Sequence, residues 1–152
     1  MALKVGDIAP NELGKDQDGK ELSVDQFSGK KVILYFYPKD NTPTCTVQSC
    51  NLRDGREMLK RKGYEVIGVS ADTEKKHQNF IKKFDLNFPL VADTELKTIK
   101  AYGVWGLKKF MGREYEGIIR TTFVIDEEGK IEQVINKVKA KQHSEQILNT
   151  DS

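Results

Sequence analysis

A continuous apolar run, Val32-Ile-Leu-Tyr-Phe-Tyr37, constrains the fold of this chain more than any other part of its sequence. The run is β-branched, aromatic or leucine throughout, and it is bounded by Lys30-Lys31 on one side and by Pro38 on the other. Because no polar residue alternates with the apolar ones, a strand formed here must be covered on both faces. The run therefore predicts a central strand of a layered α/β sheet.

Strand and helix patterns alternate along the rest of the chain. An Asp-Gly turn at 17–20 and a capping pattern at 23–26 predict a small hairpin and a short helical turn, and Thr42-Pro43 is typical of the start of a helix that Gly63 ends. The other predicted elements are a strand at 64–70, a helix from 72 to about 84, a strand at 88–92, a helix from 93 to 103, an irregular stretch at 104–116, a hairpin with strands 118–125 and 130–138, and a helix at 144–148. This order predicts a thioredoxin-like fold, a three-layer α/β/α sandwich with a central mixed sheet, formed as a single domain by residues 1–152.

Composition excludes several classes of protein. With 38% hydrophobic and 9% aromatic residues, the chain is too apolar for disorder. A formal net charge of +2 is too small for a nucleic-acid interface. No apolar run is long enough to span a bilayer, and the N-terminus lacks the pattern of a signal peptide. We therefore expect a cytoplasmic protein that binds neither nucleic acid nor membrane.

The chain has two cysteines, Cys45 and Cys50, and both fall in the helix predicted after Thr42. Cys45 is the third residue after that cap, where unpaired backbone N–H groups and the positive end of the helix dipole favour a thiolate. Residues five apart on an α-helix have Cα atoms about 8.7 Å apart, which exceeds the ~7 Å limit for a disulfide. A disulfide between the two cysteines would therefore require the helix to unwind, which indicates a reactive site rather than a permanent structural disulfide.

Two structural explanations of the cysteines compete with this interpretation. Cys45 could be a buried core residue, although its polar surroundings at a helix start argue against that role. Cys45 and Cys50 could also bind zinc with His77 and His143, but those histidines are 66 positions apart, whereas structural zinc sites space them a few residues apart. We expect both histidines to face solvent, and we expect no metal or cofactor.

The residues around Cys45 resemble a known family. Pro38-Lys-Asp-Asn-Thr-Pro-Thr-Cys45 is similar to the Pro-x-x-x-Thr-x-x-Cys signature of peroxiredoxins. The segments Cys50-Asn-Leu-Arg-Asp54, Lys108-Lys-Phe-Met-Gly112 and Gly117-Ile-Ile-Arg-Thr-Thr-Phe-Val-Ile-Asp126 resemble the bacterioferritin-comigratory-protein (PrxQ-like) subfamily, so the resemblance covers nearly the whole chain. It implies a thioredoxin-like fold and a thiol peroxidase that needs no metal, flavin or haem.

The resemblance also implies roles for individual residues. Cys45 matches the peroxidatic cysteine, Thr42 the hydroxyl offered to the bound peroxide, and Pro38 the residue that shields the pocket. Cys50 matches the resolving cysteine, and Arg120 the arginine that steadies the thiolate and the peroxide oxygens. Arg120 is also the only charged residue in the strand predicted at 118–125, where an uncompensated buried cation would be costly; an edge strand with the guanidinium in water is the alternative.

A reaction cycle follows from these implied roles. Cys45 would reduce hydrogen peroxide or an organic hydroperoxide and become a sulfenic acid, Cys50 would condense with it, and thioredoxin or a similar dithiol protein would reduce the disulfide. The protein would serve antioxidant defence and redox homeostasis as a monomer or weak homodimer. Two other functions remain open: a disulfide oxidoreductase, which usually has Cys-x-x-Cys, and a redox sensor or holdase switched by oxidation of Cys45.

Three residues depart from the subfamily pattern. Thr44 precedes the cysteine where glycine is usual, Gln48 stands where glutamate is common, and Leu107 stands where a charged residue often follows Trp105-Gly. These departures bear on local backbone geometry, on helix unwinding and on substrate preference, but they leave the nucleophile in place.

Overall fold

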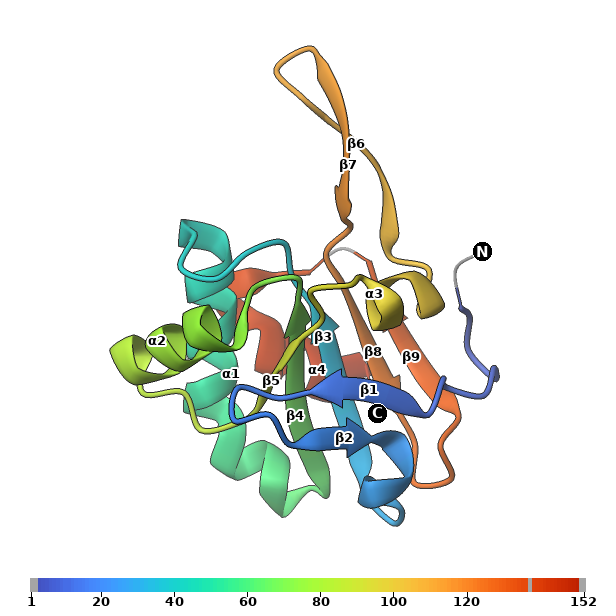
Figure 1. Cartoon of the computed structure of the whole chain (residues 1–152). Helices are drawn as coiled ribbons and strands as arrows, with labels where there is room; N and C mark the ends of the chain where they lie inside the picture. Colours follow the sequence, from blue (N-terminus) through green and yellow to red (C-terminus); the bar gives the residue numbers. More distant parts are fainter. Residues whose placement is uncertain (1–2, 137, 151–152) are drawn as a thin grey trace.

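A computed structural model describes residues 3–136 and 138–150 of the chain. A five-stranded sheet in the order β5-β4-β3-β8-β9 forms its centre (Figure 1). β3, β4 and β5 run parallel, whereas β8 is antiparallel to β3 and to β9, so the sheet is mixed, as the sequence predicts. The strands are β3 (Lys31–Phe36), β4 (Tyr64–Ser70), β5 (Leu90–Ala92), β8 (Thr121–Ile125) and β9 (Ile131–Ile135).

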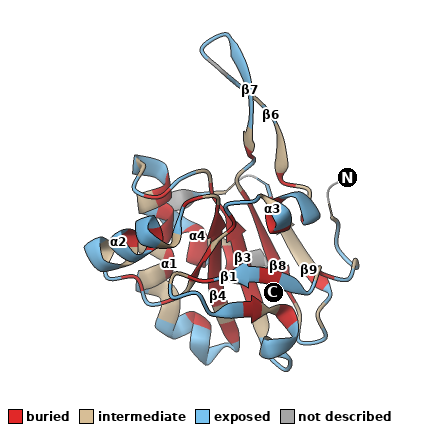
Figure 2. Ribbon diagram, in the orientation of Figure 1, coloured by how far each residue is buried: buried red, intermediate tan, exposed pale blue. Residues whose placement is uncertain are grey.

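The two faces of β3 enter two separate cores, because side chains alternate along a strand. Val32, Leu34 and Phe36 face one core, and Ile33 and Tyr35 face the other. Figure 2 shows the resulting buried sheet between exposed outer elements. The second core lies under α1 (Pro43–Arg61), α2 (Glu74–Phe84) and α4 (His143–Thr150), and the first under β1 (Glu12–Lys15), β2 (Glu21–Ser23), η1 (Val24–Phe27) and α3 (Lys97–Ala101).

The helices on the second core begin and end close to the predicted residues. α1 starts at Pro43 after Thr42 and ends at Arg61, just before Gly63. The Thr73 hydroxyl caps α2 by accepting a hydrogen bond from the Lys76 N–H at 3.2 Å. None of the helices in the described part of the chain is long and apolar enough to cross a membrane.

The stretch predicted to be irregular at 104–116 is instead a hairpin of β6 (Trp105–Phe110) and β7 (Arg113–Ile118). It projects from the body as an arm (Figure 1). Met111 and Gly112 form its turn and both have positive φ, 52° and 79°, which suits the right-handed twist of a two-residue hairpin loop. The sequence does not predict this turn, because methionine seldom adopts the left-handed conformation that Met111 has here.

The strand predicted at 118–125 is divided in two. β7 ends at Ile118 and β8 begins at Thr121, and Ile119 and Arg120 form a two-residue link between them. The Ile119 N–H donates to the Val104 carbonyl at 2.7 Å, and the Thr121 hydroxyl donates to the Ile119 carbonyl at 3.0 Å. Arg120 therefore lies in a link that hydrogen bonds hold between two strands, rather than inside a strand. β9 is also shorter than predicted, and residue 137 of the predicted 130–138 strand lies outside the described residues.

Candidate active site

The antiparallel pairing of β3 with β8 brings distant parts of the chain to one place. Phe36, the last residue of β3, lies opposite Thr121, the first residue of β8. Arg120 precedes Thr121, and the loop that follows β3 leads into α1 and Cys45. Arg120 and Cys45 therefore meet at the carboxyl end of β3, although 75 positions separate them in the sequence.

Cys45 lies in the first turn of α1 with only 1% of its surface exposed. The first helical hydrogen bond runs from the Thr46 N–H to the Thr42 carbonyl at 2.8 Å, so the sulfur stands near N–H groups that lack a helical partner. Arg120 Nη2 donates to Cys45 Sγ at 3.0 Å. A guanidinium donor and a helix start both stabilise negative charge on the sulfur, so this geometry suits a cysteine that reacts as a thiolate.

Gln48 lies one turn after Cys45 and is fully buried. Its side-chain oxygen accepts a hydrogen bond from Arg120 Nη1, so Arg120 is held by Gln48 and Cys45 together. Because the Gln48 amide is neutral, it orients the Arg120 guanidinium without neutralising the positive charge that faces the Cys45 sulfur. Gln48 Nε2 is buried and has no hydrogen-bond partner within the described residues. A glutamate would have placed a second anion here, so this departure from the subfamily pattern changes the charge of the site.

Pro38 and Thr42 lie in the loop between β3 and α1, and both are half-buried. The Thr42 hydroxyl does not cap α1 but donates to the Lys39 carbonyl at 3.2 Å. It is thus held at the helix start. Thr44 is exposed in the first turn of α1, so its side chain is accommodated by the helix. Leu107 is 61% exposed on the β6–β7 arm.

Cys50 lies on α1 with Cys45, and both are free thiols. Cys50 is half-buried. The next residue, Asn51, donates to the Lys141 carbonyl at 2.8 Å and accepts hydrogen bonds from the Ser144 N–H and hydroxyl at 2.8 and 3.1 Å. The part of α1 after Cys50 is thereby fastened to the start of α4.

His77 is buried beside the loop between β3 and α1, so the prediction that it faces solvent is wrong. His77 is 0% exposed; its Nδ1 lies 2.6 Å from Asp40 Oδ2, and its Nε2 lies 2.9 Å from the Val91 carbonyl. The Tyr37 hydroxyl donates to the other Asp40 oxygen at 2.5 Å. The Asp40 N–H donates to Asp72 Oδ2 at 2.7 Å. These contacts fix Asp40 in the middle of the loop that precedes Cys45.

His143 is also fully buried, contrary to the prediction. Its Nε2 lies 2.8 Å from the Thr122 hydroxyl and its Nδ1 lies 3.0 Å from Gln146 Oε1. Burial lowers the pKa of His143 to about 4, against the opposing effect of the Gln146 hydrogen bond, and the positive charge of Arg120 lowers it further. His143 is therefore neutral near pH 7. Within the described residues, no group of three or more His, Cys, Asp or Glu side chains could hold a metal ion.

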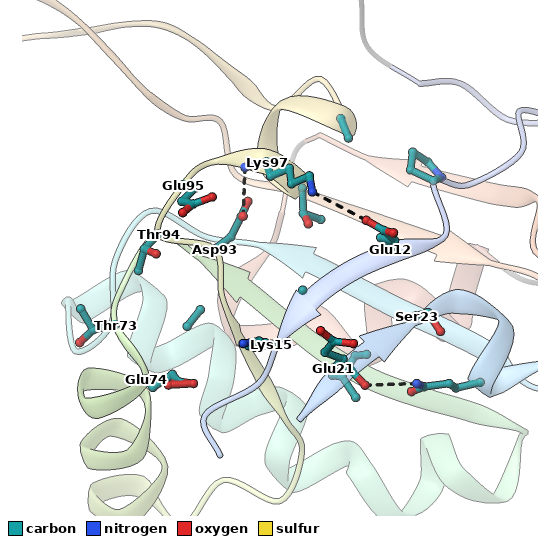
Figure 3. Close-up of a pocket in the computed structure, with 17 residues that line it drawn as sticks. Glu12, Lys15, Glu21, Ser23, Thr73, Glu74, Asp93, Thr94, Glu95 and Lys97 are labelled. Carbon is teal, nitrogen blue, oxygen red and sulfur yellow. Dashed lines mark hydrogen bonds and ion pairs between the residues drawn. The ribbon is translucent and has the colours of Figure 1, made fainter. Parts of the chain in front are cut away.

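Of two cavities lined by described residues, only the smaller one adjoins the turn of α1 that carries Cys45. A cavity of about 1070 Å³ lies between the β1–β2 hairpin and the segment that leads into α3, and Glu12, Glu74 and Glu95 are among its lining residues (Figure 3). Lys97 bridges part of it, with Nζ 3.9 Å from Glu12. Cys45 is not among its lining residues. A smaller cavity of about 500 Å³ adjoins the active-site helix and is lined by Pro43, Thr44, Val47, Lys139, Lys141 and Gln142.

The mixed sheet, with a buried cysteine held by an arginine at the start of α1, defines a protein with a thioredoxin-like fold. The chain belongs to the AhpC/TSA family, whose family model matches residues 5–134. It is 46% identical over 147 residues to Peroxiredoxin Bcp of Escherichia coli strain K12, covering 97% of this chain and 94% of that protein. It is 42% identical to Peroxiredoxin Bcp of Bacillus subtilis strain 168, covering 99% and 96%.

Solved structures agree with this assignment. A cysteine-to-serine variant of Xylella fastidiosa PrxQ superposes with a TM-score of 0.90 at 28% identity, covering 99% of this chain and 96% of that one. The bacterioferritin comigratory protein of Xanthomonas campestris, solved in trapped-intermediate and ligand complexes that bear on its alkyl peroxide reduction activity, gives 0.85 at 29% identity, covering 97% and 94%. The chain is therefore a peroxiredoxin of the Bcp/PrxQ type with a thioredoxin-like fold, and this membership supports a thiol peroxidase activity.

Proposed function

We propose that this chain reduces hydrogen peroxide and organic hydroperoxides through Cys45. The thiolate attacks one peroxide oxygen, the O–O bond breaks, and the other oxygen leaves as hydroxide or alkoxide and takes up a proton, which leaves Cys45 as a sulfenic acid. The contact of Arg120 Nη2 with Cys45 Sγ at 3.0 Å is the observation that carries this proposal. We assign Thr42 to the bound peroxide and Pro38 to shielding of the pocket.

Formation of thiolate alone would not make a good peroxidase. For a thiol in general, lowering the pKa from about 8.5 to about 6 raises the thiolate fraction at pH 7 roughly 30-fold, but the accompanying loss of nucleophilicity is about 13-fold. The net gain is about twofold. The remaining acceleration must come from groups that bind the breaking O–O bond better than the ground state. Arg120, fixed by Gln48, and the Thr42 hydroxyl are suited to that role.

Cys50 completes the cycle in this proposal. Its thiol attacks the sulfenic sulfur of Cys45, which releases water and forms an intramolecular disulfide. Because both residues lie on one intact helix, the first turns of α1 must unwind for the sulfurs to meet. Asn51 is tied to α4, so unwinding would stop at Cys50. Thioredoxin or a similar dithiol protein would then reduce the disulfide and restore the helix.

A coupled assay tests the cycle. Oxidation of NADPH through thioredoxin reductase and thioredoxin is followed with hydrogen peroxide and with cumene hydroperoxide, on wild type, Cys45→Ser and Cys50→Ser. Wild type should turn over both peroxides. Cys45→Ser should be inactive, and Cys50→Ser should consume about one equivalent and stop with thioredoxin.

Other outcomes would favour other functions. Full activity of Cys45→Ser would overturn the assignment of the nucleophile. Wild type that stops after one equivalent despite a suitable dithiol would favour a redox sensor. Rapid reduction of insulin disulfides with negligible peroxide consumption would favour a disulfide oxidoreductase.

A further inference from the structure

Lys108 crosses one face of the β6–β7 hairpin toward the active site. It lies on β6 opposite Tyr115 of β7, and alternate residues of a strand share a face, so Lys108, Tyr115 and Gly117 lie on the same face. Lys108 Cδ lies 3.3 Å from the place that a Cβ on residue 117 would occupy. Glycine at this position therefore leaves room for the lysine stem to run along the hairpin toward its base.

The ammonium contacts the end of β7, next to the link that carries Arg120. Lys108 Nζ donates to the carbonyl of Ile118, the last residue of β7, at 2.9 Å. Only Ile119 separates this carbonyl from Arg120, and the Ile119 N–H is itself bonded to Val104. The lysine thus helps to fix the backbone from which the guanidinium reaches Cys45.

The charges of the reacting groups act on the same ammonium. Burial lowers the pKa of Lys108, and the positive charge of Arg120 lowers it further, while Cys45 acts in the opposite direction. Arg120 and Cys45 are thus the charged groups that act on it, and Tyr115 is the titratable side chain that shares its face of the hairpin.

Neighbouring carboxylates lie on the opposite face of the hairpin. Glu114 pairs there with Lys109, whose Nζ lies 3.6 Å from its carboxylate, and Glu116 accepts a hydrogen bond from the Trp105 indole at 3.1 Å. In the ion pairs between described residues, Lys108 has no carboxylate partner. Its charge therefore stays available to an anion at the active site.

We propose that Lys108 is a positioning residue of the active site, which holds the link that carries Arg120 and places a second cation near the Cys45 thiolate. Among Cys45, Arg120 and Lys108, one thiolate and two cations leave a net positive charge, so these three groups favour a reagent that brings a negative charge. The inference rests on the proposed role of Cys45 as the reactive nucleophile.

Alkylation by two reagents with the same leaving group tests it. In a Cys50→Ser background Cys45 is the only thiol, and the rate constants with anionic iodoacetate and neutral iodoacetamide are measured at one pH. Lys108→Met keeps the stem and removes the charge, Lys108→Arg keeps a charged donor, and Lys109→Met is the matched control on the other face. Lys108→Met should lower the iodoacetate-to-iodoacetamide ratio about three- to tenfold at low ionic strength, and the loss should shrink in 0.5 M salt.

The positioning role has its own readout. The rate of sulfenic acid formation with hydrogen peroxide should fall in Lys108→Met and return in Lys108→Arg, while Lys109→Met behaves like wild type in every assay. An unchanged ratio in Lys108→Met, or an equal change in Lys109→Met, would overturn the proposal. Alkylation requires a reactive Cys45 but no peroxidase activity, so an inactive wild type would count against the proposed function without affecting the ratio.

Discussion

Replacing Arg120 by methionine should separate reaction with peroxide from simple nucleophilicity of Cys45. The substitution keeps an apolar stem but removes the donor that lies 3.0 Å from Cys45 Sγ. A hydrogen bond to a charged group contributes about 1.5–3 kcal/mol, and 1.36 kcal/mol corresponds to a tenfold change in rate. If the donor that Arg120 supplies acts in the transition state, losing it should lower the rate constant with peroxide by about 10- to 150-fold. Thr42→Val removes a neutral hydroxyl and should cost about two- to tenfold.

Two assays on the same variants carry the comparison. Stopped-flow mixing with hydrogen peroxide measures sulfenic acid formation, and alkylation by iodoacetamide measures a reaction with no O–O bond to polarise. Both are followed across pH and compared where each rate has reached its plateau, which removes differences in thiolate population. Iodoacetamide rates should change by less than about threefold. Arg113→Met, at an exposed position on β7, is the control.

Equal losses in the two assays would refute the reasoning, because they would mean that Arg120 acts only through the thiolate. Arg120→Met also leaves the buried Gln48 oxygen without its donor. Thermal unfolding of the variant should therefore be recorded beside its kinetics, since an unsatisfied buried group costs about 1–3 kcal/mol. Peroxide rates are then compared only at temperatures where the variant is folded.

Three further predictions concern stability. Gly55→Ala would place a Cβ 2.6 Å from the Ser144 side chain, so urea unfolding should show a loss of about 1–3 kcal/mol from overpacking between α1 and α4. Asp40→Ala leaves His77 Nδ1 buried without its hydrogen-bond partner, and the same measurement should show a loss of about 1–3 kcal/mol, whereas an unchanged free energy of unfolding would contradict this role of the pair. The pKa of His143 is lowered from 6.5 to about 4 in the fold, so the unfolded chain binds more protons between these pH values. The free energy of unfolding should therefore fall by up to about 3 kcal/mol as pH drops from 7 to 4. His143→Gln should flatten this part of the dependence of stability on pH.

Local patterns predict the centre of the molecule well. β3, β4 and α1 were predictable because a two-sided apolar run, a second such run and a Thr-Pro helix start each depend on neighbouring residues alone. The β6–β7 hairpin was not predictable in this way. Its lysines and glutamates have low strand propensity, and cross-strand contacts such as Lys109 with Glu114 help to stabilise it.

In the candidate site, too, the features set by neighbouring residues were predictable and those set by long-range contacts were not. Cys45 follows from its position at a helix start, but its contact with Arg120 depends on the register of β8 against β3, which no local pattern encodes. The burial of His77 could have been inferred, because His77, Phe80 and Phe84 are spaced along one face of α2. A polar imidazole is expected to face solvent unless a hydrogen-bond partner is buried with it. That partner, Asp40, lies in the loop before α1, so the pattern of α2 does not predict it.

The attachment of Asn51 to α4 gives α1 two parts with opposing requirements. In the proposed cycle the turns before Asn51 must melt and reform at every turnover, while the turns after it keep their place in the core. A substitution that strengthens the early turns would raise the melting temperature and slow disulfide formation in the same molecule. Selection for heat resistance in this chain should therefore leave the segment between Cys45 and Cys50 weak, and thermostability should accumulate elsewhere in the fold.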